Sequence, residues 1–148
     1  MYFIDRNKLE SLLVFMTNQF DLLDGHSSWT STLEIRALER IVHLIIESFL
    51  DVGNQLIDGF IMRDPGSYED IVAILIDESV LPKSSEEASF ALVNLRKGLV
   101  QDYVDVDPSE LFNALQKYSK DWRQFPDRVR TYLENELGPV SAFKPTND

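Results

Sequence analysis

Cysteine is absent from the 148 residues, and histidine occurs only twice, as His26 and His43. A disulfide framework is therefore excluded, and so is a cysteine-based zinc site. The two histidines fall on different segments, so they provide no compact set of imidazole ligands. We expect no structural metal and no cofactor.

Long apolar runs are also missing, and none reaches the roughly eighteen residues that a membrane-spanning helix needs. The opening stretch MYFIDRNKLE carries charge where a secretion signal would be apolar. We expect a cytoplasmic protein that does not enter a membrane.

Basic residues are few, with 14 Lys and Arg against 25 Asp and Glu and a net charge of -11. Such a charge repels nucleic acid at long range, so any RNA site must be local.

What the chain does contain is apolar residues at three-to-four spacing through most of its length, interrupted by polar or Gly/Pro clusters. This pattern predicts an all-α domain over residues 1–138, an antiparallel bundle of about five helices, with a tail over residues 139–148. The predicted helices span about 5–23, 32–61, 68–78, 84–103 and 107–137.

Several residues mark the predicted helix ends. Ser67 and Ser84 each have an acidic residue three positions later, the spacing of a capping box. Asp107, followed by proline, is typical of a helix start. Pro126 should kink or interrupt the last helix, which continues to Gly138, a natural C-cap.

The helix predicted over residues 32–61 is apolar around most of its circumference, as expected at the centre of a bundle or of a dimer. A polar seam nevertheless follows its whole length in steps of three or four residues: Arg36, Arg40, His43, Glu47, Asp51, Asn54 and Asp58. The seam is either a stripe that faces water or the lining of a cleft. Its order, basic first and acidic later, is opposite to what the helix dipole favours, which is an argument for the cleft.

The stretch RKGLVQDY, residues 96–103, ends the fourth predicted helix. On a regular helix Arg96 and Tyr103 lie on nearly the same side, whereas Gln101 points about 140° away from Arg96. Arg96 and Gln101 could converge if Gly98 loosens the turn, if the helix ends at Gln101, or if a two-fold axis brings in a second copy. Taken alone, the stretch is equally typical of an ordinary helix end, with a surface arginine, an exposed glutamine and a half-buried tyrosine.

Three stretches together resemble the HepT-like branch of the HEPN superfamily: YFIDRNKLE, ALERIVHLIIESFLDVGNQLIDGFIMRDPGSYEDIVAIL and LRKGLVQDYVDVDPSELF. Proteins of this branch are small, all-α and dimeric, and include the ribonuclease toxins of HepT/MntA toxin–antitoxin pairs. The family signature is an arginine, four to six residues, and then His-x-Tyr. Arg96 and Tyr103 occupy its first and last positions, and Gln101 stands in place of the histidine, which gives the variant R-x4-Q-x-Y.

The resemblance implies a HEPN-like homodimer with a cleft at its two-fold interface, and metal-independent RNA endonuclease activity that uses the ribose 2′-OH. It implies catalytic roles for Arg96, Gln101 and Tyr103, and a supporting cleft of His43, Glu47, Asp51 and Asn54. In active members the arginine positions phosphate and the histidine transfers protons. Glutamine forms hydrogen bonds but does not titrate, so we expect reduced or lost activity. His43 either takes the place of the missing histidine or is a partly buried histidine whose hydrogen bonds are made and that has no role in the chemistry.

The resemblance also implies a partner. An MntA-like nucleotidyltransferase antitoxin silences such toxins by transferring AMP to the motif tyrosine, so Tyr103 is the matching AMP acceptor. Three functions stay open from the sequence. The protein is a ribonuclease toxin acting on RNA, or a catalytically inactive dimer that binds a partner or a nucleotide in the same cleft, or a purely structural oligomerisation module.

Overall fold

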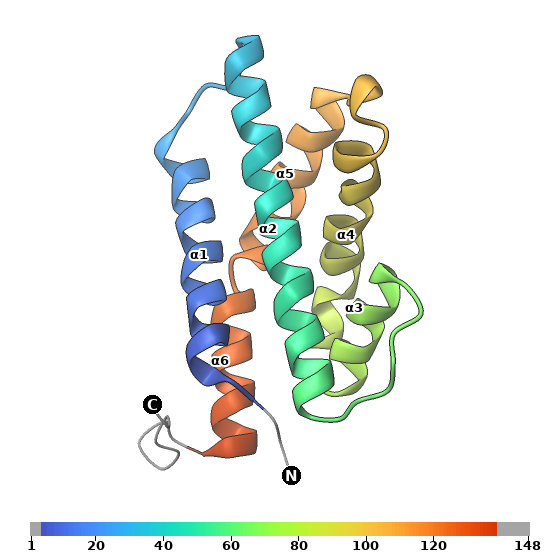
Figure 1. The fold of residues 1–148 in the computed structure, drawn as a ribbon. Helices are drawn as coiled ribbons and strands as arrows, with labels where there is room; N and C mark the ends of the chain where they lie inside the picture. Colours follow the sequence, from blue (N-terminus) through green and yellow to red (C-terminus); the bar gives the residue numbers. More distant parts are fainter. Residues whose placement is uncertain (1–3, 139–148) are drawn as a thin grey trace.

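Helices account for all the regular secondary structure in residues 4–138, the part of the chain that the computed structural model describes. In order, they are α1 (Arg6–Gly25), α2 (Thr32–Gly59), α3 (Tyr68–Asp77), the 3₁₀ turn η1 (Lys83–Ser85), α4 (Glu86–Val100), the 3₁₀ turn η2 (Tyr103–Asp105), α5 (Pro108–Trp122) and α6 (Phe125–Leu137). The helices form an antiparallel bundle, so the predicted all-α fold class is confirmed (Figure 1). The predicted tail, residues 139–148, lies outside the described residues.

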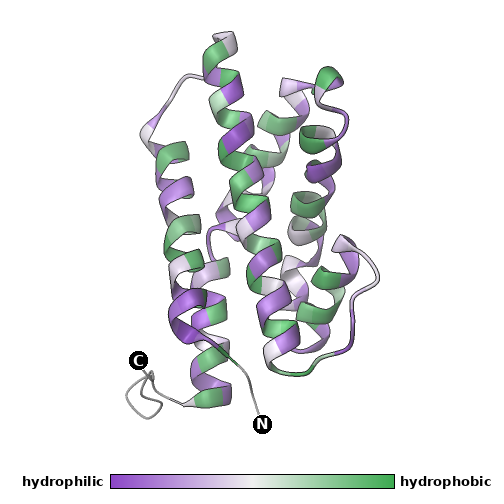
Figure 2. Ribbon diagram, in the orientation of Figure 1, coloured by the Kyte–Doolittle hydropathy of each residue, from purple (hydrophilic) through white to green (hydrophobic). Residues whose placement is uncertain are grey.

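α2 is the central helix of the bundle and contacts α1, α3 and α4 (Figure 1). α4 in turn packs against α3 and α5, and α6 packs against α1. Hydrophobic and hydrophilic residues are interspersed along every helix (Figure 2). Most apolar residues of α2 are buried within a single chain, including Ile45, Phe49 and Leu56, whereas Leu33 near its start is exposed. The apolar circumference of α2 is therefore explained by the bundle and does not by itself require a second copy.

Side-chain caps fix several helix starts. Asp107 accepts a hydrogen bond from the Ser109 amide, as predicted. The Ser67 side chain accepts one from the Asp70 amide, which is half of the predicted capping box, because the Asp70 carboxylate accepts from Arg63 and Gly66 instead. Gly138 is the C-cap of α6 with φ of 84°, a conformation that favours glycine. At the start of α2, Ser31 forms a complete capping box that we did not predict from the sequence.

The capping box predicted at Ser84 is wrong. Residues 83–85 form η1, and α4 begins at Glu86, two residues later than predicted. The Ser85 hydroxyl does not cap the helix. It donates to the carboxylate of Asp121 on α5 at 2.9 Å and accepts from Arg128 on α6. A buried contact between distant segments thus takes the place of the local cap.

The last predicted helix is divided in two. α5 ends at Trp122 and α6 begins at Phe125, so Pro126 lies in the first turn of α6, where its missing N–H costs no helical hydrogen bond. The break lets the residues on either side pack in different directions. The Trp122 indole donates to the Ala88 carbonyl at 2.6 Å, and the Phe125 ring lies 4.5 Å from that of Phe49. The predicted interruption at Pro126 is therefore confirmed.

α2 approaches α3 closely at Gly53. A Cβ added there would lie 2.8 Å from Cγ2 of Ile71, a buried, β-branched side chain with little freedom to turn away. Gly53→Ala should lower the free energy of unfolding by about 1–3 kcal/mol in urea titrations, although alanine favours a helix by about 1 kcal/mol. Gly98→Ala is the matched control, because its Cβ would meet nothing within 4 Å, and it should stabilise the protein. A neutral Gly53→Ala would contradict the tight contact.

Arg63 and Asp70 clamp the loop before α3. Arg63 donates two hydrogen bonds to the Asp70 carboxylate, at 2.7 and 2.8 Å, and the Gly66 amide donates a third. These bonds, those of Arg63 first, lower the pKa of Asp70 to about 2. Because the pKa is lower in the folded than in the unfolded chain, the clamp stabilises the protein above about pH 4, and this contribution is lost as the pH falls to about 2.

The corresponding test is urea unfolding of the natural protein and of Asp70→Asn at a series of pH values. Asp70→Asn should lose less stability than the natural protein between about pH 5 and about pH 2, since the titrating clamp is gone. An equal loss in both proteins would show that the clamp contributes nothing to the pH dependence.

Candidate functional site

Arg96 is held in place by Glu47, which lies 49 residues earlier in the chain. The Arg96 Nε donates to Glu47 Oε2 at 2.8 Å, and Nη2 donates to Oε1 at 3.3 Å. The Arg96 side chain is only 18% exposed, and its hydrogen bonds to Glu47 raise its pKa. Its Nη1 makes no hydrogen bond with any residue from 4 to 138. The arginine is therefore fixed in direction, with one donor nitrogen left for a ligand.

The aromatic neighbour of Arg96 is Tyr68, the first residue of α3. Its ring lies 4.7 Å from the Arg96 guanidinium carbon, and the tyrosine is 47% exposed. We did not identify Tyr68 as a site residue from the sequence, where it appears only as the start of a helix. The packing of α3 against α2 and α4 brings it to Arg96, and no spacing within one helix could have revealed this contact.

The polar seam of α2 forms a chain of contacts that ends at Arg96. Arg40 Nη1 lies 3.3 Å from His43 Nδ1, and His43 Nε2 lies 4.0 Å from Glu47 Oε1. Desolvation, followed by the nearby charge of Glu47, raises the pKa of Asp51. His43 thus belongs to the same polar network as Arg96 but reaches it only through Glu47.

The remaining seam residues behave as a water-facing stripe. Asn54 and Asp58 are exposed, and Arg36 pairs with Glu39 rather than with another seam residue. The two interpretations of the seam therefore apply to different parts of it. Its centre, at His43 and Glu47, is partly buried and leads to Arg96, whereas its two ends face solvent.

α4 ends at Val100, three residues earlier than predicted, and Gln101 is its C-cap. The amides of Gln101 and Asp102 both donate to the Lys97 carbonyl at 2.9 Å. Tyr103 then begins η2 and is 68% exposed. Of the three conditions under which Gln101 could meet Arg96, one is present in the described chain, namely the helix end at Gln101. Within residues 4–138, however, no hydrogen bond joins Arg96 to Gln101 or Tyr103.

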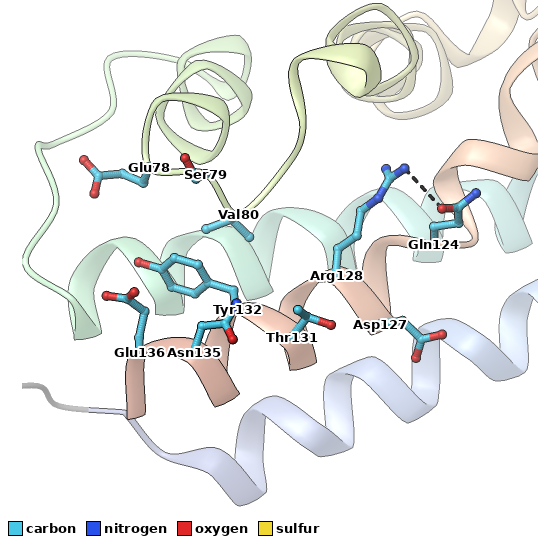
Figure 3. A pocket seen from close by; sticks show the side chains of 10 residues that line it. All are labelled: Glu78, Ser79, Val80, Gln124, Asp127, Arg128, Thr131, Tyr132, Asn135 and Glu136. Carbon is cyan, nitrogen blue, oxygen red and sulfur yellow. Dashed lines mark hydrogen bonds between the residues drawn. The ribbon is translucent and has the colours of Figure 1, made fainter. Parts of the chain in front are cut away.

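A separate pocket of about 390 Å³ lies between the segment after α3 and helix α6 (Figure 3). Its lining includes Glu78, Asp127 and Glu136, together with Arg128, whose guanidinium donates to Gln124. None of the site residues predicted from the sequence lines it. Across residues 4–138 no cluster of three or more His, Asp or Glu side chains could hold a metal ion, and no helix in that range is long and apolar enough to cross a membrane.

Comparison with known proteins shows the family of the chain. The model of the ribonuclease HepT-like family matches residues 14–129, and the chain belongs to this family. It is 49% identical over 144 residues to a protein of Bacillus subtilis (strain 168) named "Putative RNase YutE", with 97% of this chain and all of the relative covered. The solved structure of YutE, described as a cytosolic protein of unknown function, superimposes with a TM-score of 0.92 over 97% of this chain.

Proposed function

We propose that the protein is a metal-independent RNA endonuclease of the HepT-like type, with activity reduced by the loss of the motif histidine. The observation that carries the proposal is the fixed guanidinium of Arg96. Two hydrogen bonds to Glu47 hold it, and its Nη1, which bonds no residue from 4 to 138, would bind a phosphate oxygen. Family membership supports the reaction class, as does the name "Putative RNase YutE" of a relative that is 49% identical.

The residues of the motif have distinct roles in this proposal. Arg96 binds the scissile phosphate, and Gln101 hydrogen-bonds the substrate without exchanging protons. His43 contacts Glu47, which in turn holds Arg96. In this proposal His43 therefore supports the position of Arg96 and does not touch the substrate. Tyr103, exposed at the start of η2, is open to a modifying enzyme and is the proposed AMP acceptor.

The complete site in this proposal belongs to a homodimer. Within one chain Arg96 points to α2, whereas Gln101 and Tyr103 follow the end of α4. A two-fold axis that places the second copy's Gln101 and Tyr103 beside Arg96 would assemble the motif. We also propose a cytoplasmic location, in line with the cytosolic description of YutE, and an MntA-like nucleotidyltransferase as the antitoxin partner.

The proposal is tested by incubating the protein with single-stranded RNA and transfer RNA in EDTA, after mass spectrometry has shown that Tyr103 carries no adduct. We expect slow cleavage at defined sites. An RNA with one 2′-deoxy nucleotide at a mapped site should resist cleavage there, because the attacking hydroxyl is gone. Cleavage that needs a divalent metal, or that ignores the 2′-deoxy substitution, would contradict the proposed chemistry.

A catalytically inactive HepT-like dimer that binds a partner or a nucleotide in the same cleft is the second candidate. It is favoured by Gln101, which cannot serve as an acid or a base, and by the net charge of -11. If RNA stays intact in the assay above, this candidate replaces the first.

A further inference from the structure

A groove lies between α4 and α5 and ends at η2. It encloses about 760 Å³, and its lining is mostly apolar, with Leu95 and Leu99 from α4 facing Leu111 and Ala114 from α5. Neither Arg96 nor any residue of the α2 seam lines it. The groove therefore shares no lining residue with the candidate ribonuclease site, and it adjoins that site at Asp102, which lies between Gln101 and Tyr103.

Gly98 lies in the wall of this groove. Glycine inside a helix costs about 1 kcal/mol relative to alanine, and a Cβ at Gly98 would meet nothing within 4 Å. Packing among the described residues therefore does not account for this glycine, in contrast to Gly53 with its close contact to Ile71. One structural use of a glycine in regular backbone is to let a second molecule approach closely.

The end of the groove beside η2 is acidic. Asp102, Asp105 and Glu110 line it, and none of them forms an ion pair with any residue from 4 to 138. Of the two lysines in the lining, Lys117 forms an ion pair with Glu87 at 3.4 Å. Lys97 is then the one lysine of the lining that forms no ion pair with residues 4–138. Unpaired carboxylates around an apolar groove favour an occupant that carries both apolar and basic side chains.

We propose that the α4–α5 groove is a docking surface for a basic amphipathic helix of another protein, with apolar side chains against Leu95 and Leu111 and with Lys or Arg beside Asp105 and Glu110. A second copy seated on the groove by the same face is disfavoured, because the unpaired carboxylates of Asp105 and Glu110 would then meet those of the other copy. RNA is disfavoured because its phosphates would meet the same carboxylates. In binding of this kind, the docked helix inserts apolar side chains that are three or four residues apart into the groove.

The test uses two synthetic helical peptides with leucine at the same three-to-four spacing, one with lysine and one with glutamate at all other positions. Titration calorimetry at about 150 mM salt, where long-range attraction is screened, should give saturable one-to-one binding of the lysine peptide. The glutamate peptide should bind at least about tenfold more weakly. No binding of the lysine peptide, or equal binding of both, would overturn the proposal.

Variants assign the binding to the groove. Gly98→Leu, which fills it, and the double variant Asp105→Asn/Glu110→Gln should each weaken binding by about tenfold or more. The matched control is Asp64→Asn/Glu69→Gln, which removes the same charge from residues outside the lining and should leave affinity unchanged. Equal weakening by the control, or no effect of the groove variants, would overturn the proposal. So would a change of oligomeric mass in Gly98→Leu, because the occupant would then be a second copy.

Discussion

Replacing Gln101 with histidine is expected to accelerate metal-free RNA cleavage by about 10²–10⁴, the usual contribution of a positioned acid or base. Gln101 is exposed and caps α4 with ordinary helical φ and ψ, so the substitution should leave the fold intact. Histidine would restore a proton-transfer group near neutral pH, which glutamine cannot provide. Single-turnover cleavage of single-stranded RNA in EDTA measures the effect.

Gln101→Asn is the matched control for this gain, since it changes the same exposed position without adding a titrating group. The rate of Gln101→His should also vary with pH around the ordinary histidine pKa of about 6.5. If Gln101→His cleaves no faster than Gln101→Asn, position 101 does not reach the reacting atoms, and its assignment to the motif fails.

Truncating Phe49 is expected to have the largest effect on stability. Phe49 is buried at the centre of α2, and its ring packs 4.5 Å from that of Phe125, just after the break between α5 and α6. Phe49→Ala should therefore lower the free energy of unfolding by about 3–5 kcal/mol. The measurement is urea unfolding followed by circular dichroism.

Leu33→Ala serves as the control for Phe49→Ala. Leu33 is on the same helix but 82% exposed, so its truncation should change stability by no more than about 0.5 kcal/mol. A small loss in Phe49→Ala would mean that the α2–α6 contact is not part of the cooperative core. A large loss in Leu33→Ala would mean that its exposed side chain is covered in solution, for instance by a second copy.

Helix positions and several ends could be predicted from the sequence because they depend on local signals. Apolar periodicity located every α-helix. As predicted, Asp107 caps the start of α5, Pro126 lies in the first turn of α6, and Gly138 caps the end of α6. The errors have nonlocal causes. Ser84 has the spacing of a capping box, but Ser85 bonds to α5 and α6 instead, and α4 starts later.

The candidate site was predictable only in part, for the same physical reason. The spacing along α2 placed Glu47 on a polar face, but it could not say that this face meets Arg96 on α4. Tyr68 carries no local signal at all, because α3 brings it to Arg96 from a third helix. Spacing within one helix identifies a face, whereas the partner of that face is decided by packing between helices.

The most direct test of a ribonuclease site at Arg96 is the dependence of RNA cleavage on this residue, measured in EDTA in the natural protein and in the Gln101→His background. Arg96→Ala should abolish cleavage in both backgrounds, and Arg96→Lys should restore little of it, because lysine lacks the planar fork that Glu47 holds. Circular dichroism and oligomeric mass should match the parent proteins. Cleavage that persists at the parental rate in a folded Arg96→Ala protein would contradict the assignment of the site to Arg96.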